Sequence, residues 1–412
     1  MNSMATRHAP DVKVPLAHIL TGAAAALAGG LLLVWRGPAL LGAPVGDLRA
    51  LALTHLFTLG WLTMTIVGAT YQLVPVVLEV RLRSEGLARS GYPLLLAGIA
   101  LLVGGFWTGR TGLLIPGALL TAGALLAYAA HLTATVLGAT AHRMQRLFFL
   151  GATAYLSLVC ALGGLMAADF RWNFLRADLL PVHVIAAVLG WVTLLAMGVA
   201  YKLTPMFALS HGHGDGAGMV VFGLWFAGTV LLILGVALGW PAPAVAALGL
   251  PLVAAIALFL RDQHAFFRTR YRPHLDVGSR LVVAACGYLA LTAVAGWLDL
   301  AGAVHLPPAS LVILAVLGWL GCLVAGQTYK IVPFLVWFHR YAGRAGRERV
   351  PLLREMYDGR LAEAGMWGMV GAGLLLAAGV TAAAPWLIRL GGAAWLCGYG
   401  VLAYNLMQVL RA

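Results

Sequence analysis

Two histidines inside long apolar stretches are the residues of this chain whose type and position could support cofactor chemistry. His55 lies five residues before Gly60, and His183 lies seven residues before Gly190. An ionisable side chain within a membrane-crossing stretch is costly, so it is a functional candidate by default. A neutral imidazole is the commonest metal ligand in proteins and a frequent axial ligand of haem iron. The alternative for each histidine is a hydrogen bond to a backbone carbonyl, or anchoring at the membrane interface.

Both histidines precede copies of one sequence motif that occurs three times. The motif reads G-W-x6-G-x2-Y-[QK]-[LI]-[VT]-P, with the same spacing in every copy, and its prolines are separated by 130 and then 128 residues. We interpret this as an internal triplication, in which each copy forms the same element of a repeated unit. The fixed positions are Gly60, Trp61, Gly68, Tyr71 and Pro75, then Gly190, Trp191, Gly198, Tyr201 and Pro205, and then Gly318, Trp319, Gly326, Tyr329 and Pro333.

The composition excludes a soluble globular protein. The chain has 412 residues, of which 62% are hydrophobic and 10% are charged, whereas ordinary soluble domains carry about 25% charged residues. The net charge of +13 does not indicate nucleic-acid binding, because the basic residues lie in short loops between apolar segments. The four cysteines lie far apart inside apolar segments, so neither a disulfide framework nor a thiolate metal site is indicated.

An apolar helix must carry each copy of the motif. A helix needs roughly 20 apolar residues to cross a bilayer, and the motif copies fall in the second, sixth and tenth of twelve such segments. The sequence therefore predicts an all-α, twelve-span membrane protein. It also predicts three four-helix units, at about 1–145, 146–275 and 276–412, around a pseudo-threefold axis along the membrane normal. The expected spans are 15–35, 50–78, 92–109, 112–137, 147–168, 180–208, 217–239, 243–260, 280–300, 308–338, 363–382 and 386–409.

The distribution of basic residues predicts the orientation. With the N-terminus inside, the inner segments hold 19 of the 27 lysines and arginines, Arg7 among them, and the outer loops hold six. Because cytoplasmic loops carry the excess of basic residues, both termini are expected in the cytoplasm of a bacterial-type inner membrane. The basic inner loops 261–280 and 339–362 are best explained as topology signals, with binding of anionic lipid or a partner protein as the alternative.

Some polar residues of the inner half also allow two interpretations. Gln72, Lys202 and Lys330 occupy equivalent positions of the three motif copies and could line a polar vestibule. A lysine near a helix end more often extends to the lipid headgroups, and we favour that interpretation. In the loop that follows the second copy, His211 and His213 could touch a metal, but a glycine-rich turn is the favoured interpretation.

The motif resembles the tenth helix of the catalytic subunit of haem–copper oxidases, particularly the cbb-type cytochrome oxidases and the related nitric oxide reductases. The twelve-helix, pseudo-threefold architecture with an inside N-terminus is similar as well, over nearly the whole chain. In that family the histidine seven residues before the motif glycine binds the high-spin haem, and the one five residues before it binds the low-spin haem. Span two supplies the other low-spin haem ligand, and span six supplies one histidine of the copper site. The resemblance therefore implies a haem ligand at His55 and a copper ligand at His183.

The chain departs from this family at the other ligand positions. Leu311 and Ile313 stand in span ten where the family has its two haem histidines, and span seven (217–239) contains no histidine to complete a copper site. The usual binuclear centre cannot be assembled from these residues. The resemblance therefore implies a divergent member that lacks most of the metal-ligand histidines, with one b-type haem as the expected cofactor and without the usual copper site.

The expected function is that of a subunit I-like membrane protein that binds haem for electron transfer or for binding nitric oxide or oxygen, rather than for full oxygen reduction. His55 is the expected first haem ligand, and His183, His305 or Met64 the second. If the protein is an enzyme, it is a haem-dependent oxidoreductase. Besides the lipid bilayer, the implied partner is a cytochrome c or another respiratory membrane subunit. The alternative is non-enzymatic transport or metal or haem handling on the same scaffold, or a role like that of nitric-oxide-response membrane proteins.

Overall fold

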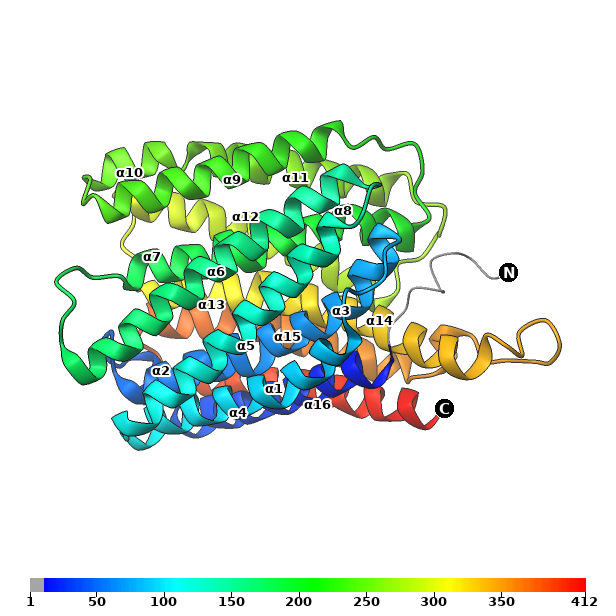
Figure 1. Cartoon of the computed structure of the whole chain (residues 1–412), viewed down its shortest axis with the longest axis horizontal. Coiled ribbons are helices and arrows are strands. Elements are labelled where there is room, and N and C mark those ends of the chain that lie inside the picture. The colour runs from blue at the N-terminus through cyan, green and yellow to red at the C-terminus, as the bar shows by residue number, and fades with distance from the viewer. Residues whose placement is uncertain (1–10) are drawn as a thin grey trace.

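The computed structural model describes residues 11–412, and this part of the chain is a bundle of long helices without a β-strand (Figure 1). Arg7 lies outside the described residues. Twelve helices are long and apolar enough to cross a membrane, which confirms the predicted number of spans. They are Lys13–Leu41 (α1), Leu48–Leu78 (α2 and α3), Glu85–Thr108 (α4), Thr111–Leu137 (α5), Arg143–Trp172 (α6), Leu180–Ala208 (α7 and α8), Gly216–Ala237 (α9), Ala242–Arg268 (α10 and α11), Val277–Leu300 (α12), Pro308–Tyr341 (α13 and α14), Gly359–Thr381 (α15) and Pro385–Arg411 (α16).

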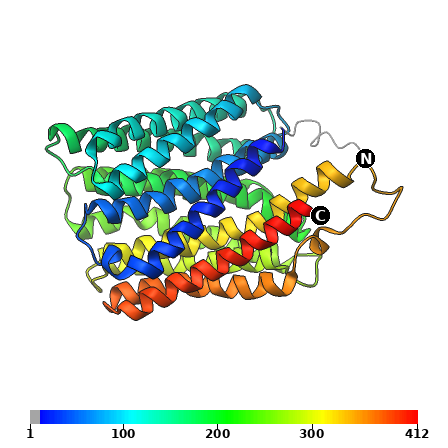
Figure 2. The same ribbon diagram turned by 90° about the horizontal axis from the view of Figure 1, so that it is seen from below.

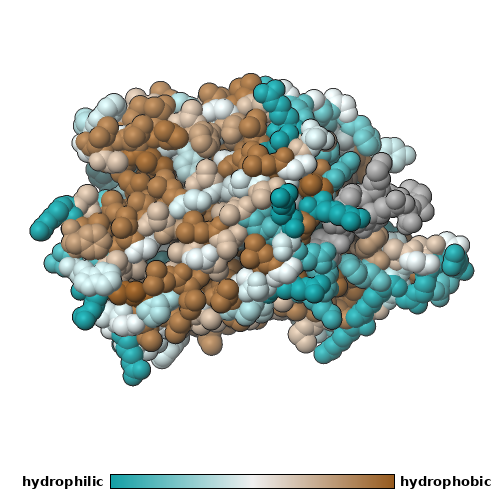
Figure 3. Space-filling view, in the orientation of Figure 1, coloured by the Kyte–Doolittle hydropathy of each residue, from teal (hydrophilic) through white to brown (hydrophobic). Residues whose placement is uncertain are grey.

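Both ends of the described chain lie at the same end of the bundle, as an even number of spans requires (Figures 1 and 2). Hydrophobic residues cover the middle of the face shown in Figure 3, and hydrophilic residues gather toward the two ends. This distribution is the one that a bilayer demands of a spanning bundle, because the hydrocarbon interior cannot solvate polar groups. The protein is therefore a multi-pass membrane protein, and which end faces the cytoplasm stays a prediction.

The three motif-bearing spans form the centre of the bundle. In the most apolar 18-residue stretch of these three spans, 61%, 67% and 78% of the residues are buried. In the other nine spans the buried share of that stretch is 28–44%. Each is interrupted around its Gly-Trp pair by a π-helical segment: Leu56–Thr63, Ala186–Thr193 and Leu314–Leu320. Such segments are rare and often occur at functional sites. The same irregularity at the same place in three spans supports the triplication, although the unit boundaries stay a prediction.

The motif glycines let each central span approach the first span of its own unit. A Cβ on Gly190 would lie 2.4 Å from the ring of Tyr155 in α6, and one on Gly318 would lie 2.2 Å from the ring of Tyr288 in α12. No side chain larger than hydrogen fits at that distance, so glycine is required at these positions. In all three units the nearest side chains of the first span that the two motif glycines meet are seven residues apart: Ala25 and His18, Tyr155 and Phe148, and Tyr288 and Leu281.

The motif tryptophans pack between the units rather than at the membrane interface. Trp61 and Trp319 are 1% and 2% exposed. The indole nitrogen of Trp319 donates to Thr193 Oγ1 over 3.3 Å, across the contact between the second and third units. Because tryptophan is large and rigid, it fixes the distance between neighbouring units where it is buried.

The three motif-bearing spans end differently at the end of the bundle that carries the Tyr-to-Pro part of the motif. This end is called the inner end here. α3 and α8 end three residues after their prolines, where Glu79 and Leu209 adopt a left-handed conformation with φ of 54°. The third copy has no such turn, and α14 continues to Tyr341 before a loop that projects beyond the bundle (Figure 1).

Candidate functional site

A cavity of about 150 Å³, called the outer cavity here, lies between the first two units. Its walls come from spans two to six, which are helices α2 to α8. Two residues of the tenth span close its deep end. Leu51, Phe170 and Leu180 line it near the outer ends of their spans, so the cavity extends toward the outer end of the bundle. Most of the lining is aliphatic, which suits an apolar group more than a charged one.

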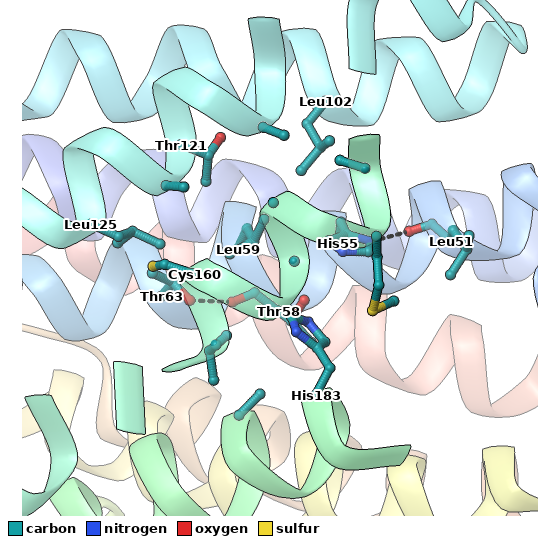
Figure 4. Close-up of a pocket in the computed structure, with 18 of the residues that line it drawn as sticks. Leu51, His55, Thr58, Leu59, Thr63, Leu102, Thr121, Leu125, Cys160 and His183 are labelled. Carbon is teal, nitrogen blue, oxygen red and sulfur yellow. Dashed lines mark hydrogen bonds between the residues drawn. The ribbon is translucent and has the colours of Figure 1, made fainter. Parts of the chain in front are cut away.

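His55 and His183 both line this cavity, and Figure 4 shows them at the same pocket, reached from different helices. The structure therefore brings together the two histidines that the sequence singles out. They come from equivalent spans of two units, at offsets from the motif glycine that differ by two residues. Two imidazoles at one cavity form a donor set that would hold the iron of one haem.

The ring of His55 is held in place on two sides. Its Nδ1 lies 2.8 Å from the Leu51 carbonyl oxygen, and the ring stacks on Phe106 with 5.1 Å between centroids. If Nδ1 carries the proton and donates to that carbonyl, Nε2 keeps a lone pair for a metal, as in most histidine-ligated sites. The bond alone does not identify a metal ligand. His18 makes the same contact with the Val14 carbonyl at 2.8 Å, and it does not line the outer cavity.

His183 has a different environment. The ring lies near the Val159 backbone, but its buried Nδ1 makes no hydrogen bond of ordinary geometry within the part of the chain that the structure describes. The ring faces Gly163 of α6, where a Cβ would lie 3.1 Å from His183 Cε1. A glycine at this position therefore makes room for the imidazole.

The deep end of the outer cavity carries further polar groups. Thr63 lines it, but its hydroxyl donates to the Thr58 carbonyl at 2.7 Å, five residues back along the π-helical segment (Figure 4). Trp191 also lines it, and its buried indole nitrogen has no partner among residues 11–412. Sequence reasoning identified Trp191 as a motif residue but gave no sign that its N–H is left without an acceptor.

The other residues considered as second ligands are not at this cavity. Met64 is fully buried elsewhere, and His305 is exposed in an outer loop. Met166 of α6 does line the cavity, and no pattern in the sequence distinguishes it from other apolar residues. Within residues 11–412 no group of three or more histidine, cysteine, aspartate or glutamate side chains could hold a metal ion. His213, which the sequence analysis considered as a residue that could touch a metal, contacts the hydroxyls of Ser210 and Thr269.

The space between spans two and ten, where the family resemblance implies the low-spin haem, is filled by aromatic rings. Trp61 and Trp395 lie 5.0 Å apart, Trp395 stacks on Tyr399 at 4.4 Å, and Phe57 meets Trp395 at 5.6 Å. A haem does not fit between these spans in this arrangement. α16, the fourth span of the third unit, fills this space with two large rings. The fourth span of the first unit, α5, places the smaller Thr121 and Leu125 at the outer cavity, and these leave the space open.

A second, smaller cavity lies deeper on the axis that relates the three units. It measures about 60 Å³ and is called the central cavity here. Each unit contributes the residues five, six, nine and ten positions after its first motif glycine, so the lining repeats threefold. These residues are Thr65, Ile66, Ala69 and Thr70, then Leu195, Ala196, Val199 and Ala200, and then Leu323, Val324, Gln327 and Thr328.

From the sequence we favoured a Lys330 side chain that extends to the lipid headgroups. The structure shows that this interpretation is wrong, because Lys330 bonds within the protein at the inner end. Its ammonium pairs with Asp276 and donates to Ser279 Oγ at 3.0 Å. Asp276 also caps α12 by accepting the Ser279 N–H at 2.9 Å. Burial acts to raise the pKa of Asp276, but the Lys330 ammonium and these hydrogen bonds outweigh it, so the pKa of Asp276 lies below its ordinary value. The sequence could not show this pair, because its members are 54 residues apart.

Comparison with known proteins supports the fold. No family model matches the chain, and no curated protein matches it in sequence. Among solved structures, the chain is similar to a haem–copper terminal oxidase that was determined as a dimer, with a TM-score of 0.60 and 13% identity. The similarity covers 97% of this chain and 84% of the other. At this identity the comparison shows the fold alone, which is the one that the sequence motif implied.

Proposed function

We propose that this chain, a membrane protein with the fold of haem–copper terminal oxidases, holds one haem in the outer cavity through His55 and His183. Its function would be electron transfer or binding of a small gas. The observation that carries the proposal is that the two imidazoles line one cavity between the first two units. A bacterial inner membrane and an electron-donating partner, such as a cytochrome c or another respiratory membrane subunit, belong to the same proposal.

The residues at the cavity fit a haem in their chemistry. The Leu51 carbonyl fixes the ring of His55, and the Phe106 ring covers one of its faces. When bound, a haem supplies one-electron chemistry, and binding of a gas requires one of the two histidines to leave the iron. The cavity is about 150 Å³, below the roughly 300–1,000 Å³ of cofactor pockets. Binding therefore requires lining side chains such as Leu59 and Leu102 to move apart.

The proposal includes neither copper nor oxygen reduction. The binuclear centre needs three histidines at the copper, whereas within residues 11–412 two imidazoles line the outer cavity. The aromatic rings between spans two and ten also occupy the position of the family's low-spin haem. One haem between the first two units is thus the proposal that uses the available donors.

The test is the reduced-minus-oxidised absorption spectrum of detergent-purified protein, with a pyridine haemochrome assay for stoichiometry. We expect one b-type haem per chain, which is lost in His55→Ala and retained in His18→Ala. His18 is the matched control, because it is a buried histidine with the same bond to a carbonyl four residues back.

A different result would change the conclusion. If the wild-type protein, reconstituted with haem, showed no Soret band, the proposal would be wrong, and transport or metal handling on the same scaffold would remain. Two haems with copper would mean that residues outside the expected positions act as ligands. Equal loss of haem in both variants would indicate that damage to the fold, not a missing ligand, explains the effect.

A further inference from the structure

The two histidines of the outer cavity decide what a haem held there can do. If both imidazoles stay on the iron, no position is free for a gas, and the site can only pass electrons. If one of them leaves, a diatomic gas can take its place. The surroundings of His55 and His183 differ in three respects, and each difference bears on which ring is held less firmly.

The first difference is the hydrogen bond behind each ring. The Nδ1 of His55 lies 2.8 Å from the Leu51 carbonyl oxygen (Figure 4). The Nδ1 of His183 makes no hydrogen bond of ordinary geometry within residues 11–412. A partner on the second ring nitrogen orients a histidine ligand and makes it more basic, and loss of such a partner costs roughly 10- to 100-fold in metal affinity. His183 is therefore the weaker donor of the two.

The second difference is the contact at the side of each ring. The ring of His55 stacks on Phe106 of α4, with 5.1 Å between centroids. The ring of His183 faces Gly163 of α6, which has no side chain to cover it. At the next residue, Gly164, a Cβ would meet no atom within 4 Å, so open space remains on this wall of the cavity. Turning the ring of His183 away breaks no stacked contact, whereas turning that of His55 does.

The third difference is the place of each histidine in its span. His55 is the last of the eight residues of α2 (Leu48–His55), and the span continues from it without a loop. His183 is the fourth residue of α7 (Leu180–Ile185), one turn from the outer loop that precedes the span. Helix ends open more readily than helix interiors. The backbone that carries His183 is therefore the easier one to displace.

We infer that His183 is the exchangeable ligand of the proposed haem, and that its release frees the position at which a diatomic gas binds. His55 is the permanent ligand. The inference rests on the proposed function, because it requires a haem in the outer cavity, and it favours gas binding over electron transfer as the activity. The gas belongs to the class that binds ferrous iron and enters an apolar cavity, and carbon monoxide is the probe.

The first test compares haem retention in two single variants that are purified in detergent and reconstituted with haem. We expect His183→Ala to keep its haem and, when reduced, to show the absorption spectrum of five-coordinate, high-spin iron. His55→Ala should lose the haem. Loss of haem from His183→Ala would overturn the inference, because an exchangeable ligand is not needed to hold the cofactor.

The second test is the rate at which carbon monoxide binds to the reduced, haem-loaded protein, measured by stopped flow at increasing gas concentration. Because His183 must leave first, the wild-type rate should reach an upper limit. Gly163→Ala places a Cβ 3.1 Å from His183 Cε1. It should raise this limit by about two- to tenfold, the effect of a ring pushed off its preferred rotamer. Gly164→Ala is the matched control, since it adds the same group in open space and should not raise the limit.

A variant on the other side separates the two histidines. Phe106→Leu removes the ring that stacks on His55, so it should weaken haem retention without raising the limiting rate. A rate that rises in Phe106→Leu but not in Gly163→Ala would identify His55 as the leaving ligand and overturn the inference. So would a wild-type rate without an upper limit, or equal increases in both glycine variants. A wild-type protein that binds no haem would refute the proposed function itself, so the two failures are distinguishable.

Discussion

The ion pair between Lys330 and Asp276 predicts an asymmetry that can be measured. The Lys330 side chain is 11% exposed, whereas that of Asp276 is 36% exposed. Removing one member of a buried pair costs roughly 3–5 kcal/mol when the remaining charge stays buried, and much less when solvent reaches it. Asp276→Asn leaves the ammonium without its counter-charge inside a span, so we expect a loss of about 3 kcal/mol. Lys330→Met leaves a partly solvated carboxylate that still caps α12, so we expect a loss of about 1 kcal/mol.

The assay is thermal unfolding in detergent, followed by tryptophan fluorescence at one heating rate for all variants. For a chain of this length, 1 kcal/mol corresponds to roughly 1–2 °C. Asp276→Asn should therefore lower the melting temperature by about 5 °C and Lys330→Met by about 1–2 °C. The double variant should resemble Lys330→Met, because no unpaired ammonium remains. If Lys330→Met were the more damaging single change, or if the double variant showed the sum of both losses, the reasoning from burial would be refuted.

Two further predictions concern pH and cavity size. The folded-state pKa of Asp276 lies below its ordinary value, so its contribution to stability is complete above the unfolded-state pKa of about 4 and is lost as pH falls through the lower folded value. The melting temperature of the wild type should therefore converge with that of Asp276→Asn below about pH 4, and parallel curves down to pH 2 would contradict this. Leu125→Trp should fill part of the outer cavity, as Trp395 fills the space between spans two and ten. We expect it to abolish haem binding while the elution volume in size-exclusion chromatography and the melting temperature stay at or above wild-type values, and retention of a full haem complement would count against the outer cavity as the site.

The sequence by itself determined the number of spans, the helical class and the three equivalent central helices. These follow from local properties: a run of apolar residues has one stable solution in a bilayer, and a motif repeated at constant spacing must form the same element each time. The relative depth of His55 and His183 also follows from the sequence, because position along a helix is fixed by residue count.

Only the tertiary structure decided which space each central side chain faces. His55 lies at the cavity beside the sixth span, whereas Trp395 and Tyr399, far along the chain, fill the space beside the tenth. Residue count gives depth along a helix, but the rotation of that helix and the side chains on its neighbours depend on packing between segments hundreds of residues apart. The Lys330 pair and the unpartnered Trp191 nitrogen both arise from this packing, which the order of residues alone does not reveal.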